Sequence, residues 1–187
     1  MTKRTKKKLL RIGVGLVILL LIYMVGPQVD EQLPPPLVAG TYKVIKIDDG
    51  DTIVVDMDGV EETIRFIGVD TPETKDPRKP VQCFGKAASE FTKQQIGDGP
   101  VKLEADPTNT NRDRYDRLLR YVYLPDGTLL NAKLIENGYG FAYVGFPFQK
   151  MEEFVQKQNS ARDNNRGLWA GCKPLKNEYG GFTSNPE

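Results

Sequence analysis

Three short segments that alternate between apolar and polar residues constrain the fold of this chain more than any other feature of its sequence. They are residues 42–47 (YKVIKI), 52–57 (TIVVDM) and 62–69 (ETIRFIGV). A period of two is typical of strands that bury one face. Asp58-Gly59, between the second and third segments, is a signal for a tight hairpin turn. The folded part of the chain is therefore expected to start with consecutive strands, two of which pair as a hairpin.

Further strand and helix signals continue along the chain. Two more strands are expected at residues 101–105 and 118–124. Helical spacing predicts helices over residues 84–96, 128–137 and 149–166, with Thr128 as the cap of the second and Gly97, Gly138 and Gly167 past the three ends. Residues 173–187 are expected to form a flexible tail. Five short strands with interspersed helices indicate an α+β domain, within which a small closed barrel of the OB type is one option.

The first 26 residues form a segment of a different kind. Six Lys and Arg residues lie between positions 3 and 11, and an apolar run follows at residues 12–25. This order is typical of a signal peptide or a signal anchor. Met24-Val25-Gly26 is a poor cleavage site, which favours an uncleaved transmembrane anchor, and a cleaved signal stays open as the alternative. Either outcome places the rest of the chain outside the cytoplasm, on the cell membrane or secreted.

A Pro-rich spacer, residues 27–40, separates this segment from the domain expected at residues 41–172. Residues 38–187 keep 20 of the 26 basic and 23 of the 25 acidic side chains, a formal net charge of −3. Proteins that bind nucleic acid through broad electrostatic attraction are basic. Any phosphate chemistry in this domain must therefore come from a local cluster of residues.

The chain has no histidine and only two cysteines, which excludes several kinds of site. A Ser-His-Asp triad, a His-bearing zinc site and an imidazole base are all ruled out. Acid–base work would then fall to carboxylates, Lys, Tyr or a metal-bound water, and a metal would be a hard cation held by oxygen ligands. Outside the cytoplasm, Cys83 and Cys172 are expected to pair as a disulfide, with two unrelated thiols as the alternative.

Four segments carry the residues that could do chemistry. Asp48, Asp49 and Asp51 lie within four positions, and their mutual repulsion is easier to explain if a cation binds there. The other three segments are residues 65–74 (RFIGVDTPET), 113–117 (DRYDR) and the aromatic stretch 139–147 (YGFAYVGFP). Taken singly, each is also compatible with an ordinary turn, a charged loop or core packing.

Taken together, these segments resemble the staphylococcal nuclease (thermonuclease) family over about residues 41–170. The matching strings are D-G-D-T at residues 49–52, I-R-F-I-G-V-D-T-P-E-T at 64–74, R-Y-D-R at 114–117 and G-L-W at 167–169. The resemblance implies a five-stranded OB-fold barrel with three helices. It also implies a Ca²⁺-dependent phosphodiesterase that hydrolyses DNA and RNA and leaves 3′-phosphate ends. We expect a monomer attached to the membrane through its N-terminal helix.

The resemblance also implies a role for each matching position. Asp51 and Asp70 would bind Ca²⁺ through their side chains and Thr71 through its backbone carbonyl, with Asp49 in an outer shell. Glu73 would position or deprotonate the attacking water. The implied substrate contacts are Arg65 and Arg117 on the scissile phosphate, Arg114 and Tyr115 on a neighbouring phosphate, and Leu119 and Tyr143 in the nucleotide pocket.

Two positions depart from the family pattern. Asp116 lies where some members have Gly, so its carboxylate would either weaken phosphate binding or face solvent. Gly145 lies where a second pocket tyrosine can stand, and Phe146 or Phe148 could compensate for it. A non-catalytic nucleic-acid or protein-binding module of the same fold is the alternative function, although that reading predicts loss of the charged residues that are all retained here.

Overall fold

The computed structural model describes residues 40–74, 80–178 and 180–186. The predicted membrane or signal segment and most of the Pro-rich spacer lie outside these residues. Within the described ranges, none of the helices has the length and hydrophobicity needed to cross a bilayer.

Five strands close into a barrel in the order β1-β2-β3-β6-β5. Their bounds are β1 Gly40–Asp49, β2 Thr52–Met57, β3 Val60–Phe66, β5 Pro100–Glu104 and β6 Leu118–Tyr123. Neighbouring strands are antiparallel except β3 and β6, which run parallel. The predicted five-stranded barrel of an α+β domain is therefore confirmed.

Branched and aromatic side chains fill the inside of the barrel. Ile53, Val55 and Ile64 have no exposed surface, and Phe66 and Tyr121 are 1% exposed. Burying one such aliphatic side chain contributes about 1.5–3 kcal/mol to folding. β5 alternates between exposed and buried residues, whereas β2 and β6 have runs of consecutive buried residues and are covered on both faces.

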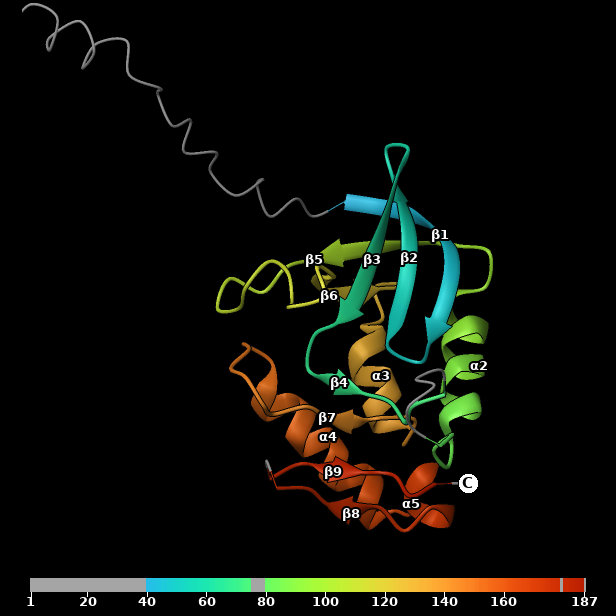
Figure 1. The fold of residues 1–187 in the computed structure, drawn as a ribbon, viewed down its shortest axis with the longest axis vertical. Helices are drawn as coiled ribbons and strands as arrows, with labels where there is room; N and C mark the ends of the chain where they lie inside the picture. The colour runs from blue at the N-terminus through green and yellow to red at the C-terminus, as the bar shows by residue number, and fades with distance from the viewer. Residues whose placement is uncertain (1–39, 75–79, 179, 187) are drawn as a thin grey trace, which may run out of the picture. The chain divides into compact units, whose positions relative to one another are not determined.

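Four helices pack against the barrel and against one another (Figure 1). Their bounds are α2 Gly85–Ile96, α3 Leu130–Glu136, α4 Met151–Asp163 and α5 Leu168–Gly171. α2 lies against β1, α3 against β6, and α4 against α3. Asn131 of α3 ties this helix to the barrel, because its amide donates to the Ile67 carbonyl at 2.9 Å and its Oδ1 accepts from the Val122 N–H at 2.8 Å.

Three predicted boundaries differ from the structure. Thr128 does not cap α3; its carbonyl accepts from the Leu124 N–H in the turn after β6, and Leu129 is the residue before the helix. α4 ends at Asp163, so Gly167 precedes the separate short helix α5. The predicted strand over residues 62–69 ends at Phe66, because Gly68 turns the chain with φ 71°. A Cβ at Gly68 would lie 2.5 Å from the Phe148 ring, so only glycine fits this turn.

After this turn, a small sheet carries the chain away from the barrel. β4 Val69–Asp70 pairs antiparallel with β7 Phe141–Ala142, so Asp70 lies opposite Phe141. The Tyr143 N–H extends the pairing by donating to the Gly68 carbonyl at 2.9 Å. The segment that carries Asp70 is therefore fixed from both sides.

The C-terminal segment is ordered where we expected a flexible tail. β8 Leu175–Lys176 and β9 Phe182–Thr183 form a hairpin. The Phe182 ring packs edge-on against Trp169 with 5.0 Å between ring centroids, and Cys172 is bonded to Cys83 with 5.7 Å between their Cα atoms. Strands of two residues are too short to show a period in the sequence, so the hairpin could not be recognised there.

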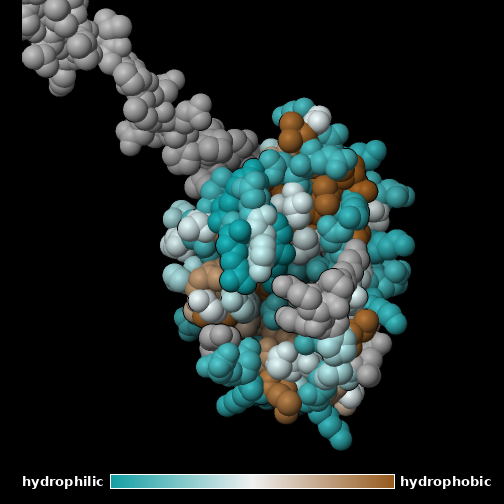
Figure 2. Space-filling model, in the orientation of Figure 1, coloured by the Kyte–Doolittle hydropathy of each residue, from teal (hydrophilic) through white to brown (hydrophobic). Residues whose placement is uncertain are grey.

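The molecular surface is mostly polar on the face drawn in Figure 2, where hydrophobic residues show only in small, separate groups. Large hydrophobic side chains with substantial exposure in the described part of the chain are Ile45, Val60, Tyr115, Tyr143 and Leu175. Two of these five, Tyr115 and Tyr143, belong to the residues predicted to contact substrate.

Candidate active site

The β1–β2 turn places Asp51 against the strand end that carries Asp70 and Thr71. Asp51 is only 4% exposed, and its Oδ2 accepts from the Thr71 N–H at 2.7 Å. The same oxygen lies 3.1 Å from Nη1 of Arg65. A carboxylate this deeply buried needs such partners, because an unpaired buried charge is costly. Two segments distant in sequence, the β1–β2 turn and residues 65–71, therefore meet at Asp51.

Arg65 of β3 is held in one orientation by groups on two sides of its guanidinium. Its Nη1 donates to the Val69 carbonyl at 2.6 Å, and its Nη2 donates to Oδ1 of Asp70 at 3.2 Å. Burial disfavours the charge of Arg65, but Asp51, Asp70 and Asp49 outweigh that effect and raise its pKa. The guanidinium thus lies between two carboxylates and is fully ionised.

Asp49 adds a third carboxylate to this corner. Its Oδ1 accepts from the Asp51 N–H at 3.2 Å. Burial and the charge of Asp51 raise the pKa of Asp49 to about 7, although Arg65 acts in the opposite direction. The single guanidinium therefore does not fully compensate the negative charge here.

These residues fit a hard divalent cation. All the side-chain donors are oxygens, which Ca²⁺ prefers, and the raised pKa of Asp49 marks a place where added positive charge is favourable. In the described ranges, no three Asp, Glu, Cys or His side chains lie close enough together to hold a metal on their own. Asp51 and Asp70 would therefore supply two side-chain ligands, with the Thr71 carbonyl and water completing the set.

Glu73 follows the strand end by three residues and is half-buried. Its Oε1 accepts from the Thr74 N–H at 2.8 Å, and its backbone N–H donates to Oε1 of Gln82 at 2.8 Å. The Glu73 carbonyl in turn accepts from the Gln82 N–H at 2.9 Å. Gln82 therefore binds both backbone polar groups of Glu73, and no pattern in the sequence predicts this contact.

The orientation of the Arg117 guanidinium depends on Asp113, to which we assigned no role from the sequence. Oδ2 of Asp113 accepts from Nε of Arg117 at 2.7 Å and lies 2.6 Å from its Nη2. Oδ1 of Asp113 accepts from the Arg117 N–H at 3.0 Å and from the Tyr115 N–H at 2.9 Å. Burial works to raise the pKa of Asp113, but these hydrogen bonds prevail and lower it. Asp113 thus shapes the loop and orients the guanidinium at once.

The loop lies beside the Arg65 strand because β6 starts directly after it. Leu119 pairs with Arg65 in the β3–β6 register, and Leu119 is 6% exposed. The charge of Asp113 also contributes to the raised pKa of Arg65. The two predicted phosphate-binding arginines therefore come from β3 and from the loop directly before its neighbour β6.

Tyr115 projects from this loop and is 62% exposed. The Arg114 guanidinium lies 4.8 Å from its ring centroid and the Arg117 guanidinium 5.3 Å. Two cations and an aromatic face thus form one exposed group, the combination that proteins use to bind single-stranded nucleic acid.

The two departures from the family pattern are resolved by the geometry. The Asp116 side chain is 88% exposed and lies 3.6 Å from Nε of Arg112, so it faces solvent and pairs away from Arg117. Its backbone has φ 64°, a conformation in which glycine is favoured, which explains why glycine can stand at this position.

At Gly145 the missing side chain leaves room for Tyr143 to fold over the backbone. A Cβ at Gly145 would lie 2.8 Å from the Tyr143 ring. Phe146 makes an edge contact with Tyr143 at 5.2 Å between centroids, whereas Phe148 is 5% exposed and packs in the core. Tyr143 is 40% exposed, so Tyr143 with Phe146 forms the exposed aromatic surface here.

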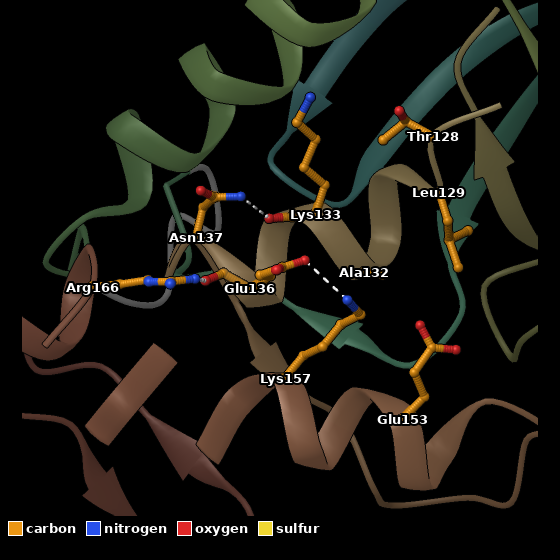
Figure 3. Close-up of a pocket in the computed structure, with 9 residues that line it drawn as sticks. All are labelled: Thr128, Leu129, Ala132, Lys133, Glu136, Asn137, Glu153, Lys157 and Arg166. Atoms are coloured by element: carbon orange, nitrogen blue, oxygen red, sulfur yellow. Dashed lines mark hydrogen bonds and ion pairs between the residues drawn. The ribbon is translucent and has the colours of Figure 1, made fainter. Parts of the chain in front are cut away.

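A hollow of about 430 Å³ lies between α3 and α4, and none of the residues predicted for catalysis lines it. Figure 3 shows Lys157 of α4 reaching Glu136 of α3, with 2.9 Å between Nζ and Oε2. Arg166 donates to the Glu136 carbonyl at 3.1 Å. Because Lys157 and Arg166 already bind Glu136 and none of the residues of the Asp51 corner lines the hollow, it is a weaker candidate than that corner.

Comparison with known proteins places the same residues in a recognised family. The model of a family described as staphylococcal nuclease homologue matches residues 63–171. Arg65, Asp70, Glu73 and Arg117 lie inside this match, and Asp51 precedes it.

Several characterised relatives are similar over most of the domain. A thermonuclease of Staphylococcus hyicus is 44% identical over 131 residues, which cover 70% of this chain and 76% of that protein. A thermonuclease of Staphylococcus intermedius is 36% identical over 168 residues, covering 89% and 98%. Endonuclease YncB of Bacillus subtilis (strain 168) is 39% identical over 124 residues, covering 65% and 58%.

Proposed function

Since this chain belongs to the staphylococcal nuclease family, we propose that it is a Ca²⁺-dependent nuclease that hydrolyses phosphodiester bonds of DNA and RNA and leaves 3′-phosphate ends. The observation that carries this proposal is the contact of Asp51, which is buried, and of Asp70 with the two sides of the Arg65 guanidinium. Phosphoryl transfer depends mainly on positioning and on charge stabilisation of the phosphate oxygens. This corner supplies carboxylates that could bind a cation and a guanidinium that could bind phosphate.

Each side chain has a defined task in this proposal. When bound by Asp51, Asp70 and the Thr71 carbonyl, Ca²⁺ supplies Lewis-acid stabilisation of the phosphate. Arg65 and Arg117 donate paired hydrogen bonds to phosphate oxygens, a geometry that Lys cannot match. Glu73 orients or deprotonates the attacking water, and Asp49 supports the negative field of the site.

Substrate binding uses residues on either side of this corner. Arg114 and Tyr115 bind a neighbouring phosphate, while Leu119 and Tyr143 border the nucleotide. Stacking of a base on an aromatic ring contributes about 1–3 kcal/mol. Such local contacts offset the net charge of −3 over residues 38–187, which gives no general attraction to nucleic acid.

We also propose that the enzyme acts outside the cytoplasm as a monomer. The support is the basic and apolar N-terminal segment, which would anchor the chain in the membrane or be cleaved on secretion. The two cysteines, bonded in the structure, suit an oxidising compartment.

The test is digestion of single-stranded DNA and of RNA by the purified full-length chain. Reactions run with Ca²⁺, with Mg²⁺ and with a chelator, and the ends of the products are identified. We expect cleavage with Ca²⁺ that the chelator abolishes, and 3′-phosphate ends. A folded chain that binds nucleic acid but cleaves it under none of these conditions would establish the non-catalytic binding module instead.

A further inference from the structure

Gln82 connects the predicted catalytic loop to the C-terminal end of the chain. All four of its polar groups are engaged. Its Oε1 accepts from the Glu73 N–H at 2.8 Å, its N–H donates to the Glu73 carbonyl at 2.9 Å, and its carbonyl accepts from the Gly85 N–H at 3.0 Å. Its Nε2 donates to Oγ1 of Thr183 at 3.4 Å. A residue that pairs with both backbone groups of Glu73 fixes where that residue lies.

The C-terminal residues that contact Gln82 lie beyond the family match, which ends at residue 171. Gln82 forms a β-bridge with Pro186. The neighbouring Cys83 donates its N–H to the Asn185 carbonyl at 2.7 Å, and its carbonyl accepts from Oγ of Ser184 at 2.8 Å. Residues 184–186 therefore run alongside Gln82 and Cys83, and Gln82 in turn contacts Glu73.

The disulfide closes this arrangement on its other side. Cys83 is bonded to Cys172, and Asn185 donates from Nδ2 to the carbonyls of Cys172 at 3.1 Å and Lys173 at 3.0 Å. Ser184 is 4% exposed, so this contact is shielded from water. The C-terminal segment is thus bound both to Cys172, the residue before it, and to Gln82 and Cys83.

We propose that Gln82 is a positioning residue for Glu73 and that the C-terminal segment, residues 173–186, fixes Gln82 in turn. The inference rests on the proposed nuclease function. A carboxylate that orients water must be held within a fraction of an ångström, and neighbouring hydrogen bonds are the means by which proteins achieve this. Gln82 acts on turnover and does not touch substrate.

The first experiment compares three variants of the full-length chain in DNA digestion at saturating Ca²⁺. Gln82→Met keeps the side-chain length and removes both polar atoms of the amide, Oε1 and Nε2. Gln82→Glu keeps an acceptor for the Glu73 N–H and loses the donor to Thr183. Gln94→Met is the matched control, because Gln94 lies on the exposed face of α2 and its Nε2 donates to Oε1 of the neighbouring Glu90 at 3.5 Å.

We expect Gln82→Met to lower kcat at least tenfold with KM and the half-saturating Ca²⁺ concentration within twofold of wild type. Gln82→Glu should recover kcat to within threefold, and Gln94→Met should match wild type. A merely structural role would give equal losses in Gln82→Met and Gln82→Glu. That result, or a kcat within twofold of wild type in Gln82→Met, would overturn the proposal.

Hydrogen exchange at the Glu73 amide tests the same inference without activity. We expect exchange at least tenfold faster in Gln82→Met, and severalfold faster in Ser184→Ala, which removes the bond from the C-terminal segment to Cys83. Unchanged exchange in both variants would overturn the inference. A wild-type chain that cleaves no nucleic acid would contradict the proposed function, and the exchange rates would then decide the positioning role alone.

Discussion

At the scale of single residues, the proposed chemistry depends on the carboxylates that pair with two arginines. Arg65 lies between Asp51 and Asp70, at 3.1 and 3.2 Å, and Arg117 is held by Asp113. In both cases carboxylates fix the plane of a guanidinium before any substrate binds. Preorganised donors of this kind stabilise a developing negative charge without a cost of reorientation during the reaction.

Arg117→Lys should lower kcat about 10²–10³-fold, because a point charge replaces a planar donor pair. The fold should be kept, since Arg117 lies in a loop with its side chain 28% exposed. Steady-state digestion of single-stranded DNA measures the effect. Arg162→Lys, on the exposed face of α4, is the control and should behave as wild type. A kcat near wild type in Arg117→Lys would remove this residue from the mechanism.

Asp116→Gly should raise the free energy of unfolding by about 0.5–1 kcal/mol, because a Cβ at φ 64° is strained. The lost contact to Arg112 is exposed and costs little. Asp116→Ala keeps the Cβ and should gain nothing, which makes it the matched control. Urea unfolding measures both variants. Equal stability of Asp116→Gly and Asp116→Ala would show that the backbone conformation is not the cause.

Residues with a role in chemistry could be found from the sequence where their type and spacing were sufficient. Asp51, Arg65 and Asp70 are of this kind, and the structure brings them into contact. Asp113 lies in the candidate segment 113–117, but the sequence did not assign it a role. Gln82 could not be found, because it acts through a hydrogen bond to the backbone of Glu73, which folding brings near. A side chain that serves another residue leaves no spacing signature of its own.

At the scale of secondary-structure elements, one buried aspartate joins three of them. Asp106, after β5, is 2% exposed. Its Oδ2 accepts from the Tyr121 hydroxyl of β6 at 2.5 Å and from the Gln149 N–H ahead of α4 at 2.7 Å. Burial works to raise the pKa of Asp106, but the hydrogen bonds from Thr108, Tyr121 and Gln149 prevail and lower it.

This shift predicts a dependence of stability on pH. Because the folded pKa of Asp106 lies below its unfolded value of about 3.9, its contribution is full above that pH and is lost as pH falls through the folded pKa. Asp106→Asn should therefore be less stable than wild type at pH 7, and the difference should shrink below about pH 4. Urea unfolding across pH measures it. A difference that stays constant from pH 7 to low pH would show that the charge of Asp106 is not involved.

Elements were predictable where their period was long enough to be seen. The strand over residues 52–57 was predicted with the bounds that β2 has, and the helix over residues 84–96 agrees with α2 to within one residue. The single predicted strand over residues 62–69 could not be divided correctly, because the close packing of Phe148 on Gly68 is a tertiary contact. β8 and β9 are two residues each and show no period at all.

At the scale of the whole molecule, a single covalent link joins the segment before α2 to the end of α5. Cys83 and Cys172 are 89 residues apart in sequence. Such a bond restricts the unfolded chain, and more so for longer loops. The link also encloses helices α2 to α5 and the barrel strands β5 and β6 within one covalent loop.

The double variant Cys83→Ser with Cys172→Ser should lose about 4–5 kcal/mol of unfolding free energy, the loop-closure value for a separation of 89 residues. Urea unfolding of the full-length chain measures this loss. Wild type treated with a reductant should show the same loss, which serves as the control for the substitutions themselves. A loss below about 1 kcal/mol in both would mean that the bond does not constrain the unfolded state as this model requires.

The proposed mechanism requires that the Asp51 corner binds Ca²⁺ and that Glu73 acts on water beside it. The decisive measurement is Ca²⁺ binding and DNA cleavage, determined together on wild type, Asp51→Asn and Glu73→Gln, each shown to be folded. We predict that Asp51→Asn loses both Ca²⁺ binding and turnover, whereas Glu73→Gln keeps Ca²⁺ binding and loses turnover. An Asp51→Asn chain that binds Ca²⁺ and cleaves DNA as wild type does would contradict the account.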